Sequence, residues 1–396
     1  MAAAKLAGLE TLPCIRATHL SPEAKIAFAI ADNRLAELSS WNEEELSIHL
    51  QELSTRDLDF DLESIGFDTV DLDRLNPEPK IRKRRLTRVE PGGEVDEEGF
   101  STDPDDVLPP PRTPQRPAMS VLGDLWIAGR HRVLCGDGRV PESFSRLLGP
   151  EQVGMVFTDP PYNVVIRNNV SKNAFREFAM GSGEMTRAEF VGFLQAFLQR
   201  CTHVVRDGAI LYVCMDWKHV GELNEAARLA GLTLKNICAW AKPYPGMGSF
   251  YRSQHEFVFV LKAGTGAHIN NFGLGARGRN RANLWFYPSV RGHRTGVNDP
   301  DGGHPTVKPA SLVMDAIRDC SKHQDIVLDP FGGSGTTMIA AERTRRRARL
   351  IEIDPHFVDL SILRWQAVTG RPATLAGDGR TFDEIAEARL GSWEEV

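Results

Sequence analysis

The sequence lacks the long apolar runs and cysteine patterns that mark membrane proteins and zinc sites. No stretch of the 396 residues approaches the roughly 18–20 continuous apolar residues of a membrane helix. Residues 1–10 lack the apolar core of a secretion signal. The six cysteines never occur as C-x-x-C, which indicates reduced thiols and argues against disulfides or zinc. We therefore expect a cytoplasmic protein with no bound metal and no membrane association.

An excess of basic charge is also absent, because the formal net charge is -6 at pH 7. Any nucleic-acid surface must therefore be a local basic patch on an acidic background. Hydrophobic residues make up 41% of the chain and charged residues 25%, which is typical of a protein with a packed core. The length suffices for two or three domains.

Three zones differ in composition. Residues 1–75 are expected to be helical, because apolar residues recur at helical spacing and Asn42 with Glu45 can cap a second helix. Residues 76–120 combine a basic run, an acidic run and a proline cluster, which is typical of an extended linker. The basic run either contacts DNA phosphates or faces solvent within that linker.

Residues 121–396 alternate short apolar strands with helices, which predicts an α/β fold with a mostly parallel sheet. The expected strands are 153–158, 209–215, 257–261, 326–329 and 348–353. The expected helices are 187–204, 217–230, 309–322, 335–345 and 355–368.

The first chemical motif is Asp159-Pro160-Pro161-Tyr162, directly after an expected strand. Ligand sites of parallel sheets lie just beyond the carboxyl ends of strands. Two prolines fix the backbone and remove N–H donors, which leaves carbonyl oxygens, a carboxylate and an aromatic face. Such a rim suits an exocyclic amine whose ring stacks on the tyrosine. The alternative is a proline-stiffened turn.

Further segments favour a small cofactor that carries a carboxylate. A strand enters a glycine-rich turn that opens a helix at Asp329-Pro330-Phe331-Gly332-Gly333-Ser334-Gly335-Thr336-Thr337. No lysine follows the last glycine and G-x-G-x-x-G is absent, so a phosphate ligand is not favoured. Glu352 ends the next strand, where such folds bind ribose hydroxyls, and the adjacent Asp354 is expected to cap a helix. In His304-Pro305-Thr306-Val307-Lys308-Pro309, the lysine can neutralise a cofactor carboxylate.

Taken together, the motifs resemble those of the DNA amino-methyltransferases that use S-adenosylmethionine. The catalytic motif precedes the cofactor loop, as in the β class of that family. The resemblance covers about 121–396 and implies a Rossmann-like methyltransferase fold. That fold has a mostly parallel, seven-stranded sheet with a circularly rearranged motif order, here after a small helical N-terminal domain.

The resemblance also implies roles for single residues. Asp329 to Thr337 would hold the methionine part of the cofactor, and Glu352 its ribose. Lys308 would lie near the cofactor carboxylate, with His304, Thr306 and Asp354 in the same cofactor-binding group. Asp137, in Cys135-Gly136-Asp137, would contact the adenine amine, although Gly377-Asp378-Gly379-Arg380 echoes that segment.

Residues 264–303 would recognise the target, because this segment is rich in glycine, asparagine and arginine. A loop whose charges face water is the alternative. The candidate DNA contacts are Arg277, Arg279, Arg281, Arg291 and Arg294.

The implied reaction is methylation of the N6 amine of adenine in double-stranded DNA. The flipped base would stack on Tyr162, and its amine would be held by Asp159 and the Pro160 carbonyl. Aspartate before Pro-Pro points to adenine, because serine is the family tendency for cytosine. N4-cytosine and RNA methylation stay open, as does a DNA-binding partition-like or phage factor with a degenerate methylase domain. Association into a homodimer and pairing with a restriction enzyme are also left open.

The N-terminal zone resembles the helical second half of a ParB-like nuclease domain, on the segment Ala29-Ile30-Ala31-Asp32-Asn33-Arg34-Leu35 followed by Trp41. The basic glycine-containing motif of such domains does not occur in the sequence. The roles expected for this zone are therefore DNA binding or docking on the methylase domain.

Overall fold

The computed structural model describes residues 21, 24, 42–54, 66–75, 104–106, 117–165, 180–243, 245–246, 250–276, 279–288 and 307–390. The chain forms two compact units. The first consists of residues 1–66 with 74–77, and the second of residues 67–73 with 78–396. None of the helices within these described ranges is long and apolar enough to span a bilayer.

Two helices are described in the N-terminal zone. Helix α3 (Glu43–Ser54) lies in the first unit, and the Glu45 N–H donates to Asn42 Oδ1 at 3.4 Å, as a helix cap requires. Helix α4 (Thr69–Leu75) follows Asp68, whose carboxylate accepts two N–H groups of the first turn. The helical prediction is confirmed at these two places. Residues 29–35 lie outside the described part of the chain.

The second unit is built on one sheet, in the order β10-β1-β2-β9-β8-β3-β4-β6-β5-β7. Strands β2, β9, β8, β3 and β4 run parallel as a central block, and β6 is antiparallel to both of its neighbours. The strands are β1 (Leu125–Ala128), β2 (His131–Cys135), β3 (Met155–Thr158), β4 (Ile210–Met215), β5 (Thr233–Ala241), β6 (His255–Lys262), β7 (Leu284–Phe286), β8 (Ile326–Asp329), β9 (Arg347–Glu352) and β10 (Thr374–Leu375).

The expected α/β fold with a mostly parallel sheet is confirmed. In the described part of the chain the sheet has ten strands and not the seven expected, because the short strands β10, β1 and β7 widen its two sides. These additions leave the central parallel block unchanged. The carboxyl ends of its strands still meet at one edge.

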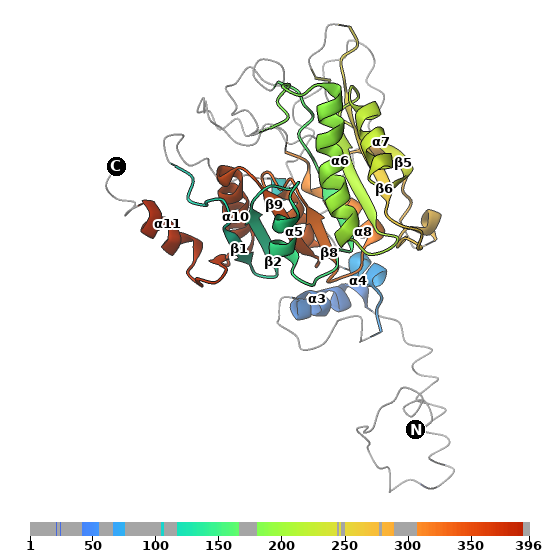
Figure 1. The fold of residues 1–396 in the computed structure, drawn as a ribbon. Helices are drawn as coiled ribbons and strands as arrows, with labels where there is room; N and C mark the ends of the chain where they lie inside the picture. The colour runs from blue at the N-terminus through green and yellow to red at the C-terminus, as the bar shows by residue number, and fades with distance from the viewer. Residues whose placement is uncertain are drawn as a thin grey trace, which may run out of the picture. The chain divides into compact units, whose positions relative to one another are not determined.

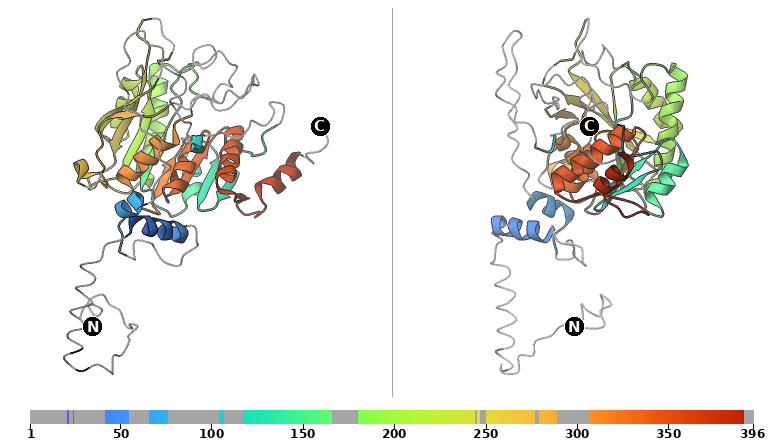
Figure 2. Two further views of the ribbon diagram at one scale, coloured as in Figure 1. Left: turned by 180° about the vertical axis from the view of Figure 1, so that it is seen from behind. Right: turned by 90° about the vertical axis from the view of Figure 1, so that its left-hand side faces the viewer.

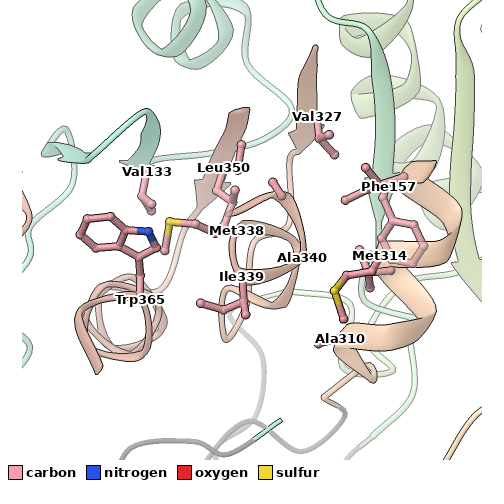
Figure 3. Close-up of a cluster of buried hydrophobic side chains, with 14 of the residues drawn as sticks. Val133, Phe157, Ala310, Met314, Val327, Met338, Ile339, Ala340, Leu350 and Trp365 are labelled. Atoms are coloured by element: carbon pink, nitrogen blue, oxygen red, sulfur yellow. The ribbon is translucent and has the colours of Figure 1, made fainter. Parts of the chain in front are cut away.

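Helices cover both faces of the sheet (Figure 1, Figure 2). Helices α5 (Pro141–Leu148), α6 (Arg187–Val204) and α7 (Val220–Leu229) share one hydrophobic core with one face. The other face packs against α8 (Ala310–Cys320), α9 (Thr336–Arg343), α10 (Pro355–Thr369) and α11 (Phe382–Leu390). Figure 3 shows this second core, in which Phe157, Val327 and Leu350 of three parallel strands lie by Met314 and Met338.

The predicted strands and helices of residues 121–396 are confirmed, with bounds shifted by three residues at most. Helix α6 has the predicted bounds, because Thr186 and Glu189 form a capping box at its start. Strand β5 was not predicted. It begins with four exposed positions, three of them polar, and shows no alternation of buried and exposed residues before Ile237.

Part of the expected linker 76–120 is bound to the second unit. Residues Pro104–Asp106 form a 3₁₀ turn (η3), and both of its aspartates are buried. Asp105 pairs with Arg343 of α9 at 2.6 Å, and Asp106 accepts the Ala310 N–H at 2.7 Å at the start of α8. These residues therefore differ from the extended linker expected.

A buried ion pair fixes residues of α4 within the second unit. The Arg346 guanidinium is fully buried and donates to both oxygens of Asp73, at 2.9 and 3.2 Å. His323 Nε2 lies 3.0 Å from the same carboxylate. Burial alone would raise the pKa of Asp73, but the His323 hydrogen bond and the Arg346 charge outweigh it and lower that pKa.

We expect Asp73→Ala to lower the free energy of unfolding by about 3–5 kcal/mol, because the Arg346 charge would stay buried without its partner. Denaturant unfolding followed by circular dichroism measures the change. The matched control is Glu222→Ala, which breaks an ion pair with Arg187, whose side chain is 68% exposed. That change should cost about 1 kcal/mol or less. Equal losses in the two variants would contradict the prediction.

Candidate functional site

One edge of the sheet collects the predicted site residues. Asp159 follows β3, Asp329 ends β8 and Glu352 ends β9. These strands run parallel, so their carboxyl ends lie together, where open α/β sheets bind ligands. The turn after β2, which is also parallel to β9, brings Asp137 to the same edge. We call this the carboxyl edge.

Asp159 is held by two side chains from different parts of the chain. The Tyr162 hydroxyl donates to its Oδ1 at 2.6 Å, and the Lys308 ammonium donates to its Oδ2. Burial raises the pKa of the Asp159 carboxyl, against the opposing charge of Lys308, and the nearby Glu256 carboxylate raises it further. A carboxylate with a raised pKa is a better proton acceptor than an ordinary aspartate.

Glu256 connects this aspartate to a second lysine. It lies in β6 and accepts from Lys308 at 3.1 Å and from Lys242, which directly follows β5. Burial alone would raise the pKa of Glu256, but the two lysines lower it to about 2. Burial would likewise lower the pKa of Lys308, and the two carboxylates raise it instead. We call Asp159, Glu256, Lys242 and Lys308 the charge cluster.

Lys308 is joined to the two carboxylates of the charge cluster. Its expected position near a cofactor carboxylate stays a prediction. Its ammonium also lies 5.5 Å from the centre of the Tyr162 ring. Lys308 is 6% exposed, so this contact is an interior one.

Sequence reasoning missed Glu256 and Lys242. Glu256 is an acidic residue directly before the apolar stretch Phe257–Leu261 of β6, where burial would demand a charged partner. That signal was available, but nothing in the sequence shows which lysines face it. Lys242 became recognisable only once β5 and β6 were paired, with Trp240 opposite Glu256.

The Asp329 carboxylate holds three segments together. Its Oδ1 accepts from Thr158 Oγ1 at 2.8 Å and from the Phe331 N–H at 3.1 Å. Its Oδ2 accepts from Thr337 Oγ1 at 2.6 Å, in the first turn of α9. Burial raises the pKa of Asp329 to about 7. The residue therefore ties the end of β3 to both ends of the glycine-rich loop.

The remaining loop residues are fixed by α10. Gly335 has φ of 78°, and a Cβ there would lie 2.9 Å from Ser361, so a larger residue would not fit. Ser361 Oγ donates to the Gly333 carbonyl at 2.8 Å. The buried Arg364 donates to Thr336 Oγ1 at 2.8 Å and to the Ser334 carbonyl at 3.2 Å.

Two other predicted loop residues make contacts with neighbouring elements. The Phe331 ring packs against aromatic rings of α6, and the Gly332 N–H donates to the Ile351 carbonyl of β9 at 2.9 Å.

Gly181, in the segment before α6, packs against Pro161, where an added Cβ would lie 2.7 Å from the proline Cβ. The Asp159-Pro160-Pro161-Tyr162 turn is therefore closely packed.

Glu352 bridges the glycine-rich loop and the start of α10. Its two carboxylate oxygens accept the Gly333 N–H and the Asp354 N–H, each at 2.8 Å. Burial raises the pKa of Glu352 to about 7. Asp354 accepts the His356 N–H at 3.0 Å, which confirms the predicted helix cap.

Asp137 lies against the glycine-rich loop. A Cβ on Gly138 would come within 2.4 Å of the Pro330 carbonyl oxygen, so the two turns touch. The Gly136 N–H donates to the Glu352 backbone carbonyl at 2.8 Å. Arg139 pairs with the Asp137 carboxylate at 2.6 Å and lowers its pKa, although burial acts in the other direction.

Two of the predicted DNA-contacting arginines pair with acidic residues of α8. Arg279 lies 3.1 Å from Asp315 and 3.0 Å from Asp319, and Arg281 Nε lies 3.0 Å from Asp319. Arg281 also donates to the Tyr287 hydroxyl at 2.8 Å. These contacts give both arginines a structural role that the sequence analysis did not foresee.

The other predicted residues of this region lie outside the described part of the chain: Arg277, Arg291, Arg294, His304 and Thr306.

Two family models match the chain. A DNA methylase model matches residues 153–363, and a ParB-methyltransferase HTH domain model matches residues 44–121. The second match confirms the ParB-related resemblance and extends it through residues expected to be linker. Both α3 and α4 lie largely within it.

Two curated relatives and one solved structure are similar to part of the chain. The chain is 25% identical over 228 residues to the Type II methyltransferase M2.MboI of Moraxella bovis. The aligned residues make up 55% of this chain and 82% of M2.MboI. It is 23% identical over 241 residues to the Type II methyltransferase M.HinfI of Haemophilus influenzae. That alignment covers 56% of this chain and 65% of M.HinfI. The crystal structure of an M1.HpyAVI–SAM complex covers 59% of this chain and 97% of that one, with 19% identity and a TM-score of 0.44.

Asp159 after β3, the glycine-rich loop after β8 and Glu352 at the end of β9 all lie within the residues that the DNA methylase model matches. The Asp137 turn lies before the matched residues. That match covers more than half of the 396 residues. The chain belongs to the DNA methylase family.

Proposed function

We propose that this protein is a site-specific DNA methyltransferase that methylates the exocyclic N6 amine of adenine in double-stranded DNA, with S-adenosylmethionine as the methyl donor. The observation that carries the proposal is the charge cluster, which holds the Asp159 carboxylate beside Tyr162 at the carboxyl edge. The glycine-rich loop that ends at α9 lies at the same edge.

The residues at the carboxyl edge fit S-adenosylmethionine. Each Glu352 oxygen accepts one backbone N–H and keeps a further lone pair for a ribose hydroxyl. Asp137, in contact with the loop through Gly138, offers an acceptor for the adenine amine. The start of α9 suits the cofactor's carboxylate, since helix N-termini favour anions. When bound, the cofactor supplies a methyl group on a sulfonium leaving group.

The residues of the charge cluster would orient the amine that receives the methyl group. The flipped base stacks on Tyr162, and the amine donates its hydrogens to Asp159 and the Pro160 carbonyl. Lys308 and Tyr162 hold the Asp159 carboxylate in place while its remaining lone pairs accept the amine. Catalysis then rests on orientation and fixed charge.

Proton transfer comes after methyl transfer, because a ring-bound amine is too weak an acid to lose a proton first. Asp159 and the Pro160 carbonyl would hold the amine so that its nitrogen lone pair faces the methyl group that a bound cofactor would supply. The extra proton on nitrogen then moves to Asp159, whose raised pKa makes it a suitable acceptor, and on to solvent.

Adenine is proposed as the base because the residue before Pro160-Pro161 is aspartate. The region matched by the ParB-methyltransferase HTH model would add DNA binding. The intact charge cluster supports an enzyme over a DNA-binding factor with a degenerate methylase domain.

Expression in a bacterial host without DNA methylation, followed by sequencing that reports modified bases, tests the activity. We expect N6-methyladenine in one short motif, and a loss of about 100-fold or more in Asp159→Asn because the amine loses its charged acceptor. Glu225→Gln, which removes a partly exposed carboxylate on α7, should leave the modification unchanged. N4-methylcytosine in place of methyladenine would overturn the base assignment. Unmodified DNA from soluble protein would overturn the activity.

Cofactor binding can be tested with a pair of matched aspartates. Asp137 and Asp378 each pair with an arginine two residues later, at 2.6 and 2.7 Å, but only Asp137 adjoins the glycine-rich loop. We expect Asp137→Asn to weaken S-adenosylmethionine binding about tenfold, as the loss of one charged hydrogen bond does. Asp378→Asn should bind as the wild type does. Isothermal titration calorimetry measures both, and equal affinities in the two variants would contradict the proposed role of Asp137.

The pH dependence of methylation tests the charge cluster. Asp159 must be ionised to accept the amine, so the rate falls as the pH drops through its pKa. Lys308→Met removes a charge that lowers this pKa, and the acid limb should move to higher pH. Glu256→Gln removes a charge that raises it, and the limb should move to lower pH. Shifts in the same direction in single-turnover pH profiles would show that Asp159 does not control the limb.

A further inference from the structure

Two neighbouring aromatic side chains are almost fully exposed. Phe250 is 86% exposed and Tyr251 is 87% exposed, and their ring centres lie 4.5 Å apart. Aromatic side chains of this size contribute most to binding when they are covered, so an exposed pair indicates an interaction surface. The mechanism proposed above makes no use of either residue.

The pair lies in the segment that joins β5 to β6 (Figure 1). Both β5 and β4 are antiparallel to β6, so β5 ends at the same edge as β4 and β3. The segment therefore leaves the sheet at the carboxyl edge. It is flanked by Lys242 and Glu256, which are both members of the charge cluster.

Hydrogen bonds brace the described residues on either side of the aromatic pair. The Lys242 N–H donates to the Gln254 carbonyl, and the Gly246 N–H donates to the Ser253 carbonyl, both at 2.8 Å. Arg252 Nε donates back to the Gly246 carbonyl at 2.8 Å. These hydrogen bonds join the two sides of the hairpin on which Phe250 and Tyr251 lie.

The charge of the segment favours nucleic acid as its partner. Residues 243–254 contain Arg252 and no aspartate or glutamate. Basic and aromatic side chains together are the composition that binds phosphates and stacks on bases. An apolar side chain of similar exposure, Leu274 at 89%, follows β6 and so belongs to the opposite edge, away from the charge cluster.

We propose that Phe250 and Tyr251 enter the DNA duplex at the target site and stack on the bases next to the adenine that leaves the helix. This inference rests on the proposed methyltransferase function. Taking a base out of the duplex removes its stacking with both neighbours, and an inserted aromatic ring replaces part of that contact. The pair thus assists base extrusion, while Asp159 acts on the amine.

The test compares methylation of two duplex oligonucleotides that carry the motif found by sequencing. In one the target adenine is paired with thymine, and in the other it is mispaired with cytosine, which lowers the cost of extrusion. For the double variant Phe250→Ala/Tyr251→Ala, we expect kcat/KM on the paired duplex to fall about tenfold or more. The loss on the mispaired duplex should be clearly smaller.

Two matched variants control for other effects. Leu234→Ala removes an apolar side chain that is 40% exposed at the other end of β5, and should methylate both duplexes as the wild type does. Phe250→Trp/Tyr251→Trp keeps two stacking rings and should retain activity on the paired duplex. Cofactor affinity by calorimetry should be unchanged in all variants.

Equal losses on the two duplexes, or none on either, would overturn the stacking role and leave the methyltransferase assignment intact. Failure of the tryptophan variant to retain activity would also count against it. A wild-type protein that methylates no DNA would overturn the proposed function and this inference with it.

Discussion

The relative position of the two halves of the site depends on the buried Asp329 carboxylate. It accepts from Thr158, the residue directly before Asp159, and from Phe331 and Thr337 on either side of the glycine-rich turn. A carboxylate with three donors around it has little freedom to move. The Asp159 turn and the glycine-rich loop are therefore held to a common point, and Glu352 joins the same loop to the start of α10.

Buried charges in the site are tolerated because they are balanced. Asp159 and Glu256 face Lys308 and Lys242, and each carboxylate is bonded to at least one lysine. An unpaired buried charge would cost several kcal/mol, so loss of one member must alter the ionisation of its neighbours. This explains why the pKa of Asp159 is raised while that of Glu256 is lowered to about 2: Glu256 contacts both lysines and Asp159 only one. Charge in this cluster is a shared property, and no member can be assigned a role in isolation.

The motifs on strand ends were predictable because a parallel block places every carboxyl end at one edge. The central strands, the helix cap at Asp354 and the position of Asp329 follow from apolar runs and turn residues. The side-chain contacts between residues distant in the sequence could not be predicted from it. Lys308 was grouped with residues expected to bind the cofactor, and it contacts Asp159, which lies 149 positions earlier. Glu256 and Lys242 meet only because β5 and β6 pair. Arg279 and Arg281 were expected to contact DNA because of the composition of residues 264–303, and their acidic hydrogen-bond partners on α8 lie 34 to 38 positions later in the chain. Sequence patterns show what a residue needs, and tertiary contacts decide which partner supplies it.

Within the second unit, helix α8 links the charge cluster to the segment that contains Arg279 and Arg281. Lys308 lies just before its first turn and holds Asp159, while Asp315 and Asp319, four residues apart and so on one face, hold Arg279 and Arg281 of the segment expected to recognise the target. The start of the helix is capped by Asp106, and its apolar side is buried against the sheet (Figure 3). A packed helix moves as one body, so a shift of the arginine segment must displace the side chains on α8 or break their ion pairs. The part of this segment that contains Arg279 and Arg281 is thereby tied to the same helix that Lys308 precedes.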